Sequence, residues 1–501
     1  MSSRPQANRT AAVSLAALVV LAGCTMGPDY QRPKVDAPAE FRDAPPAAPA
    51  TTSVTGNTTA ISPAASSVAD LPWWQVYDDP VLQALITEAL EHNYDVRIAV
   101  QNVLESRELE RIQEANLMPQ ITYSGAATRG RNQLLGNLAP QGGAYSDGAL
   151  AQVGVSWEID LWGRLRRADE AARAKYLATL EAQRGVWLSL VSDVATTYFQ
   201  LLSLDAQLQV AKDATKTYTD TLKIFQDRLE GGVASLLDVS SAAGALGAAA
   251  AQIPELESEI RQTENQLCVL LGRNPGPIAR GQPLSAQTLP PQIPAGLPSQ
   301  LLERRPDIRE AEQNLVAANA QIGVAKADFF PRLSLTGALG KVSSSFTDFT
   351  AGGSNAWAVA ANLAGPIFEG GKLTAQYKQT LAEWEAAKLQ YQSTILGAFQ
   401  EVSNALISGE KLGAVREQQE YSVKSYAQAV DVSMKRYLAG KASYYDVLDA
   451  QTKLFPNEAN LVNTRLNQLL VLVQLYKALG GGWSLKDEDY AHETEPTAPS
   501  Q

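Results

Sequence analysis

Residues Arg228 to Val239 read RLEGGVASLLDV, and residues Arg436 to Val447, 208 positions later, read RYLAGKASYYDV. Six of the twelve aligned residues are identical: Arg, Gly, Ala, Ser, Asp and Val. With the same offset, Leu271-Gly272 falls on Leu479-Gly480. Self-similarity at a fixed offset is the signature of internal repeats. The sequence therefore predicts that the two halves of the chain carry the same series of elements.

The repeated segment has the composition of a turn between two helices. Glycine permits the left-handed backbone that ends one helix, and serine can cap the next one. The predicted turns are Gly232, Val233, Ala234 and Ser235 in the first repeat and Gly440, Lys441, Ala442 and Ser443 in the second. Each repeat is therefore expected to end in a helical hairpin.

The helices that flank these turns are predicted to be long. Residues 164–230 contain no proline and a single glycine, Gly185. A helix of about 67 residues spans on the order of 100 Å. Apolar residues recur at spacings of three and four, as at Leu188, Val191 and Ala195, which is typical of coiled coils. We expect such helices at 164–230, 235–271, 371–438 and 443–480.

A pair of predicted strands opens each repeat. Apolar and polar residues alternate with a period of two, as in Ile121, Thr122, Tyr123 and Ser124. The same alternation predicts strands at about 119–129 and 151–162, and again at about 331–341 and 356–368. Such strands suit a membrane barrel with lipid on one face and water on the other, although a soluble hairpin packed on helices has the same pattern. Four strands are too few to close a barrel.

The N-terminus has the layout of an export signal. Arg4 and Arg9 precede an apolar stretch from Ala11 to Ala22, and the chain continues with Gly23 and Cys24. A cysteine directly after Leu-Ala-Gly resembles the lipobox of bacterial lipoproteins, so residues 1–23 are expected to be removed and Cys24 to carry covalent lipid. Thr25 stands where lipoproteins retained in the inner membrane typically carry Asp, which points to the outer membrane.

The composition argues against nucleic-acid binding and against catalysis. The formal net charge is −11 at pH 7 and becomes −13 without residues 1–23, which hold two arginines and no acidic residue. A strongly acidic protein is a poor partner for nucleic acid. The sequence has two histidines, His92 and His492, and Cys268 lies among leucine and valine. Because no phosphate-binding glycine loop, metal-ligand cluster or nucleophile with its base is present, a lipoprotein hydrolase is not supported.

Several motifs together resemble the TolC-like outer-membrane efflux factors, and specifically their lipoprotein branch of the NodT and OprM type. The resemblance covers nearly the whole chain. The motifs are Leu21-Ala22-Gly23-Cys24, Gly27-Pro28-Asp29-Tyr30, Trp73-Trp74, Trp157 to Gly163 (WEIDLWG), Arg304 to Ile308 (RRPDI), Pro366 to Gly371 (PIFEGG) and Leu475 to Trp483 (LYKALGGGW). Taken together, these motifs are highly specific.

The resemblance implies an α+β membrane protein that works as a homotrimer. Three copies would supply twelve strands to one closed outer-membrane β-barrel and twelve helical strands to a periplasmic α-helical barrel. The implied partners are outer-membrane lipid, a periplasmic membrane-fusion adaptor and an inner-membrane RND-type pump, and the only implied cofactor is the lipid on Cys24. The expected function is a passive exit duct for drugs or other small molecules. The alternative is a lipid-anchored periplasmic coiled-coil scaffold or adaptor without channel activity, which would not need the four alternating strands.

On this basis the chain is expected to divide into six segments. They are a signal peptide at 1–23, a lipid-anchored linker or equatorial segment at 24–72, a first repeat at 73–272, a Pro-rich connector at 273–300, a second repeat at 301–483 and a disordered tail at 484–501. Each repeat contains one strand pair and two of the long helices.

The resemblance also implies a gate at the periplasmic end. Asp446 and Asp449 match acidic residues that narrow the family's entrance, and Tyr445 lies where an apolar gate residue is common, although it is bulkier and more polar. Threefold symmetry would place six carboxylates around one axis, where like charges raise one another's proton affinity. The alternative for Asp446 is an ordinary helix cap after Ser443, and the matching Asp238 of the first repeat favours it.

The two turns at 232–235 and 440–443 resemble the family's tip loops, where the periplasmic adaptor docks. Their ordinary role is to reverse the chain, and both roles can hold at once. Arg228 and Arg436, which precede the turns, are expected to cap helix C-termini or to pair with carboxylates.

Overall fold

The computed structural model describes residues 25–36, 38, 41–42, 72–131, 145–287, 298–343, 346–350 and 355–481. The predicted signal peptide, Cys24, most of the predicted linker and the predicted tail lie outside the described residues, as does part of the Pro-rich connector. The described chain consists of four strands and of helices, several of them very long. This composition agrees with the predicted α+β class.

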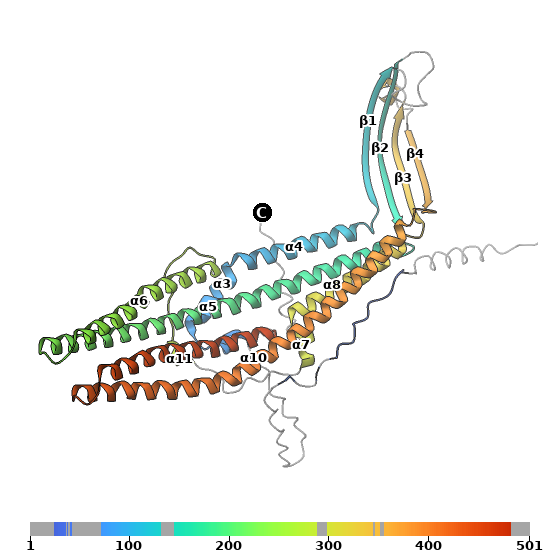
Figure 1. Ribbon diagram of the computed structural model, residues 1–501. Coiled ribbons are helices and arrows are strands. Elements are labelled where there is room, and N and C mark those ends of the chain that lie inside the picture. The colour runs from blue at the N-terminus through green and yellow to red at the C-terminus, as the bar shows by residue number, and fades with distance from the viewer. Residues whose placement is uncertain are drawn as a thin grey trace, which may run out of the picture. The chain divides into compact units, whose positions relative to one another are not determined.

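The two repeats contain matching helices of equal length, which form two hairpins (Figure 1). α5 (Arg164–Glu230) and α10 (Lys372–Leu438) each have 67 residues. α6 (Leu236–Leu270) and α11 (Tyr444–Ala478) each have 35 residues. The internal repeat and its long helices are therefore confirmed.

In each repeat, a 22-residue helix leads into two strands. These elements are α4 (Tyr94–Ala115), β1 (Gln120–Arg131) and β2 (Tyr145–Ile159), and then α8 (Pro306–Ala327), β3 (Arg332–Ser343) and β4 (Asn355–Ala364). The shorter described elements are α2 (Trp73–Val76), α3 (Pro80–His92), η3 (Leu284–Ala286), α7 (Pro298–Arg304) and α9 (Phe346–Thr350).

Two strand limits differ from the prediction. β2 begins at Tyr145 instead of near 151, and β4 ends at Ala364 instead of near 368. β4 ends there because the backbone of Gly365 packs against Pro331, where a Cβ on Gly365 would lie 2.7 Å from the Pro331 Cα, and because Pro366 has no amide N–H to donate.

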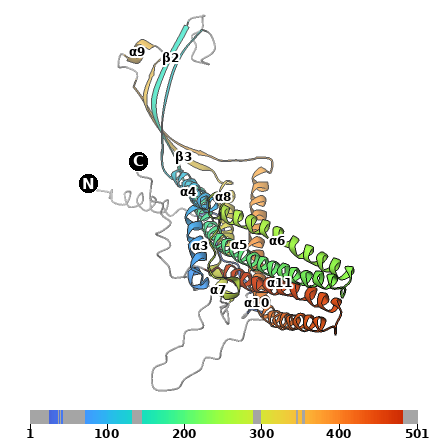
Figure 2. The same cartoon turned by 90° about the vertical axis from the view of Figure 1, so that its left-hand side faces the viewer.

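The strands form one antiparallel sheet in the order β1-β2-β3-β4. They curve along their length (Figure 2), as twisted sheets do. The register places Ile121 opposite Val155, Val155 opposite Gly337 and Gly337 opposite Val359. Because side chains alternate between the two faces of a strand, the residues of such a row share one face.

Two compact units make up the chain, and they do not coincide with the two repeats. One contains residues 102–180 and 310–392 with the N-terminal segment up to Lys34, and the other contains residues 35–101, 181–309 and 393–501. The starts at 102 and 310 are separated by the same 208 positions as the repeated motif. Each unit therefore combines equivalent parts of both repeats, so neither repeat forms a compact domain by itself.

In the first unit, residues 25–32 lie along α8 and are held at several points. A Cβ on Gly27 would lie 2.5 Å from the Gly323 Cα, so the two backbones cross in direct contact. Asn319 Nδ2 donates a hydrogen bond to the Pro28 carbonyl at 2.9 Å. The chain that follows Cys24 is thus fixed to the helix layer that continues from the strands.

In the second unit, a fully buried carboxylate, Asp79, joins three segments. It caps α3 by accepting a hydrogen bond from the Val81 N–H at 2.9 Å. It also accepts from Tyr198 Oη of α5 at 3.1 Å and from Gln287 Nε2, just after η3, at 2.8 Å. Because a buried charge is tolerated only when it is hydrogen-bonded, this residue holds the connector between the repeats against the helical core.

Among the described helices, α6 is long and apolar enough to cross a membrane by length and composition alone. A single helix of this kind is weak evidence for a membrane span. Its apolar character comes largely from alanine and glycine, and its residue Ala242 is buried in a small core with Phe225 of α5. We therefore assign α6 to the hairpin that it forms with α5.

We expect Asp79→Ala to destabilise the protein by about 3 kcal/mol. The substitution removes a helix cap, which costs about 1 kcal/mol. It also leaves buried donors such as the Tyr198 hydroxyl unsatisfied, which costs about 1–3 kcal/mol. Thermal unfolding of the purified protein, followed by circular dichroism, measures the effect.

The matched control is Asp238→Ala, which removes the exposed carboxylate of the capping box that begins α6. We expect it to cost about 1 kcal/mol, because no buried donor loses its partner. Equal shifts of the unfolding midpoint in the two variants would show that Asp79 does no more than cap α3.

Candidate functional site

One face of the sheet is apolar and exposed. Its register rows contain Tyr123, Val153, Leu339 and Trp357 in one case and Trp157, Leu335 and Ala361 in another. The large apolar residues of these rows are exposed to solvent in a single copy of the chain. An apolar band with aromatic residues is the surface that a membrane strand presents to lipid.

The opposite face of the sheet carries small and polar residues. Its rows contain Thr122, Gly154, Ala338 and Ala358, and then Ser124, Gln152, Gly340 and Ala356. At Gly340 a Cβ would lie 2.2 Å from the Ala151 carbonyl oxygen, so a side chain does not fit there. With its threonine, serine and glutamine side chains, this face is suited to contact with water.

The outer edges of β1 and β4 pair with no other strand among the described residues. Open edges carry unpaired N–H and C=O groups, and they do not persist in the hydrocarbon region of a membrane. A sheet with one lipid-compatible face therefore requires partners for both of its edges.

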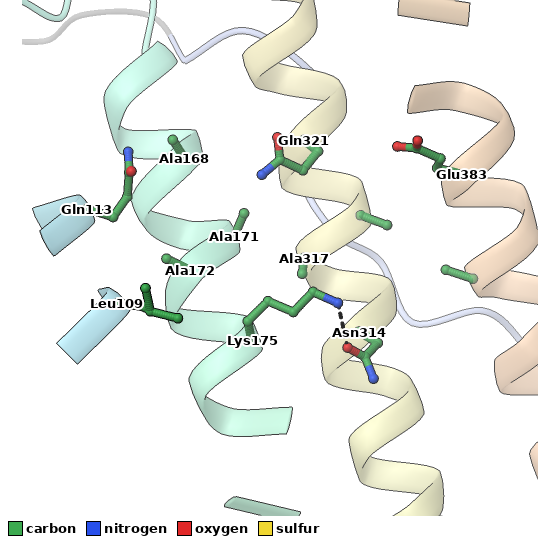
Figure 3. Close-up of a pocket in the computed structure, with 12 residues that line it drawn as sticks. Leu109, Gln113, Ala168, Ala171, Ala172, Lys175, Asn314, Ala317, Gln321 and Glu383 are labelled. Carbon is green, nitrogen blue, oxygen red and sulfur yellow. Dashed lines mark hydrogen bonds between the residues drawn. The ribbon is translucent and has the colours of Figure 1, made fainter. Parts of the chain in front are cut away.

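In the same unit, a groove of about 490 Å³ crosses the helices that adjoin the strands (Figure 3). It is lined by residues of α4, α5, α8 and α10, of which six of twelve are alanine: Leu109, Gln113, Ala168, Ala171, Ala172, Lys175, Asn314, Ala317, Ala318, Gln321, Glu383 and Ala387. Lys175 Nζ donates to Asn314 Oδ1 at 2.8 Å across it. Alanine and amide side chains make a shallow wall of mixed polarity, without the large apolar and aromatic side chains that line a tight ligand pocket.

The structure offers no metal centre in the part of the chain that it describes. No group of three His, Cys, Asp or Glu residues is placed to hold a metal ion among those residues. Cys268 is buried, and its Sγ lies 3.4 Å from the Gly276 carbonyl oxygen. A buried thiol of this kind behaves as a small apolar side chain.

The predicted turns lie at the ends of the two hairpins and are largely exposed. Gly232 and Gly440 have φ angles of +70° and +69°, the left-handed conformation that ends α5 and α10. The next residues differ between the turns: Val233 is apolar, whereas Lys441 is cationic. The two tips therefore present different chemistry, although their backbones match.

Asp446 is a helix cap, as the alternative interpretation predicted. Its Oδ2 accepts hydrogen bonds from the Ser443 N–H at 2.8 Å and from the Ser443 hydroxyl at 2.9 Å. Asp238 and Ser235 make the same capping box in the first repeat. The role of Asp446 in a ring of carboxylates stays a prediction.

Asp449 forms an ion pair that the sequence analysis did not foresee. Lys453 Nζ lies 2.7 Å from Asp449 Oδ2, one helical turn further along α11. The hydrogen bond with this carboxylate raises the pKa of Lys453. The spacing of four residues between opposite charges on a predicted helix was a signal that could have found the pair. Tyr445, one turn before Asp449, is 73% exposed.

A small aromatic core also lies close to the tips, and the sequence analysis missed it. The ring centroid of Phe225 is 4.4 Å from that of Tyr444 and 5.0 Å from that of Tyr437. Burial raises the pKa of Tyr444 to about 12. Arg228, expected to cap a helix or pair with a carboxylate, lies in the last turn of α5, and its guanidinium is 4.8 Å from the Tyr437 ring centroid. This core joins the α5–α6 hairpin to the α10–α11 hairpin.

A family model described as outer membrane efflux protein matches residues 85–273 and 297–481. The chain belongs to this family. The solvent efflux pump outer membrane protein SrpC of Pseudomonas putida is 38% identical over 472 residues, which are 94% of this chain and 97% of that protein. The cation efflux system protein CusC of Escherichia coli O6:H1 (strain CFT073) is 33% identical over 470 residues, which are 93% and 97%.

Solved structures agree with these relatives. The open state of the Neisseria gonorrhoeae MtrE outer membrane channel has a TM-score of 0.79 and 31% sequence identity, and the match covers 92% of this chain and 98% of that one. Family membership therefore confirms the predicted fold class and the predicted location in the outer membrane. It does not test the individual gate, tip and lipidation residues.

We expect Asp446→Ala to loosen the first turn of α11 by about 1 kcal/mol, because it removes half of a capping box. Hydrogen exchange of the peptide that starts at Ser443, read by mass spectrometry, measures the change. Asp449→Ala is the control, since it leaves the cap intact and removes only a surface ion pair. Faster exchange in the Asp449 variant than in the Asp446 variant would contradict the assignment.

Proposed function

We propose that this chain is one subunit of a homotrimeric outer-membrane duct that forms the passive exit of a tripartite efflux system. The observation that carries the proposal is the four-stranded sheet, which has one apolar face, one small and polar face, and two unpaired outer edges. The sheet is thus a section of a barrel wall.

Three copies satisfy the strand edges. β1 and β4 run in opposite directions, so β4 of one copy can pair in antiparallel fashion with β1 of the next. Three copies of four strands give twelve, an even number within the range of bacterial outer-membrane barrels. The helices α4, α5, α8 and α10 then continue the wall as a helical barrel, and their alanine-lined groove faces the passage.

The same arrangement supports positions at which the lipid anchor and the periplasmic adaptor would attach. Thr25 contacts Gly163 between β2 and α5, where a Cβ on Gly163 would lie 2.8 Å from the Thr25 Cα. A lipid on Cys24 would therefore attach close to the end of the sheet, beside the outer membrane. The exposed turns at 232–235 and 440–443 would receive the periplasmic adaptor, which links the duct to an inner-membrane RND-type pump.

The transported compounds are small molecules supplied by that pump. The relatives are named for efflux of solvents and of cations, which shows that one architecture serves chemically different cargo. A wide passage lined by small side chains imposes little chemistry on what passes. The energy for transport must come from the pump, since we identify no energy-coupling motif in the sequence.

We assign the narrowest point of the proposed duct to Tyr445, Asp446 and Asp449. Tyr445 is 73% exposed and so is available to close the passage by contact with its symmetry mates. Asp449 is paired with Lys453 in each copy. A ring of Asp449 residues would therefore contain alternating negative and positive charges, and not carboxylates alone. Charged rings of this kind set the ion selectivity of a pore.

Single-channel conductance in planar bilayers tests the function. We expect wild type to open rarely and Tyr445→Ala to open more often, because the substitution removes the bulk of the constriction. In a salt gradient, Asp449→Asn should shift the reversal potential toward lower cation preference, and Lys453→Gln should shift it the opposite way.

Asp238→Asn provides the charge-matched control, because it removes one carboxylate near the tip of the first hairpin, at the position that corresponds to Asp446. It should leave the reversal potential unchanged. If correctly inserted trimers never conduct, and the Tyr445 variant does not conduct either, the duct is ruled out and the lipid-anchored scaffold becomes the better account.

A further inference from the structure

We propose that Ile367 and Phe368, in the turn between β4 and α10, dock against Met118 of a second copy of this chain. The proposal rests on the trimeric duct and names a contact that would fix one copy to the next at the base of the sheet.

The two side chains are unusually exposed for their type. Ile367 is fully exposed and Phe368 is 87% exposed in a single copy. Two adjacent large apolar residues on a turn cost free energy when they face water, and such exposed pairs mark contact surfaces. We therefore expect another apolar surface to cover Ile367 and Phe368.

The turn that carries these side chains is held at both of its ends. Gly365 packs on Pro331 at its start, as described above. At its end, the Lys372 N–H donates to the Glu369 carbonyl at 3.1 Å, and the Lys372 and Glu369 side chains lie 3.7 Å apart. We call the Ile367–Phe368 pair the knob. Because the turn that carries it is held at both ends, less conformational entropy is lost when the knob docks.

The strand directions identify the occupant. When β4 of one copy pairs antiparallel with β1 of the next, the end of one strand lies beside the start of the other. Ile367 and Phe368 follow the end of β4 at Ala364 by three and four residues, and Met118 precedes the start of β1 at Gln120 by two. At about 3.3 Å per residue, all three side chains lie within roughly 15 Å of the paired strand ends.

Met118 is suited to receive this knob. It is 61% exposed and apolar, and its flexible side chain adapts to neighbouring shapes. The segment is fixed in place, because Trp157 Nε1 donates a hydrogen bond to the Leu117 carbonyl at 2.9 Å. Met118 thus lies beside one outer edge of the sheet, and Ile367 and Phe368 lie beside the other. Both sites are at the same end of the strands.

Cysteine crosslinking in the full-length, lipidated protein tests the contact. We expect Phe368→Cys combined with Met118→Cys to give covalent dimers and trimers on a denaturing gel after treatment with a short bifunctional maleimide. Each single variant should remain monomeric on the same gel. The buried Cys268 does not compete for the reagent.

The matched control is Phe368→Cys combined with Thr128→Cys. Thr128 lies on β1 ten residues beyond Met118, which is about 30 Å along the strand, so no link should form. Native mass spectrometry of every variant establishes whether trimers assemble.

Three outcomes distinguish a failure of the proposed contact from a failure of the proposed trimeric duct. Crosslinks in the Met118 pair alone support the contact. Trimers without that crosslink overturn the contact and leave the duct standing, in which case lipid covers the knob. Monomers in the wild type overturn the trimeric duct and this contact with it.

Discussion

The structure depends on the hydrogen-bonding groups at the two edges of the four-stranded sheet. In hydrocarbon, an unpaired backbone N–H or C=O costs several kcal/mol, so a sheet with an apolar face cannot end freely. One copy has four strands, which is too few to close on itself. The requirement for neighbours is therefore set by the backbone. The side chains of the knob and of Met118 add only the choice of neighbour and register.

The sequence predicted the long helices well and the spatial units poorly. The limits of α5 and α10 were readable because proline and glycine are nearly absent between capped turns. The first part of β2 was missed because Ser146 and Gly148 resemble loop residues, and pairing with β1 overrides that local preference. The units were not foreseen, because each depends on contacts between segments separated by the length of a repeat. Periodicity within one helix does not report such contacts.

At the proposed gate, the sequence singled out Asp446 and Asp449 but not the residues that they contact. Asp446 and Asp238 look alike in sequence and make the same capping box, so their position decides any difference in role. Lys453 pairs with Asp449, so a ring built from this residue in several copies would carry both signs of charge. The aromatic contact between Phe225 and Tyr444 joins residues on different hairpins, and no local pattern predicts which aromatic residues will meet.

In the proposed duct, the walls and the gate have opposite requirements. Throughput requires that cargo bind the wall weakly, because a compound held by several kcal/mol leaves slowly. Alanine and glycine on the polar face of the sheet and in the groove offer few polar contacts and little apolar depth. Tyr445 and the Asp449–Lys453 ion pair lie near the tip of one hairpin, where a few side chains could act on every molecule that passes. Selection in such a duct therefore belongs to its entrance and to the pump behind it.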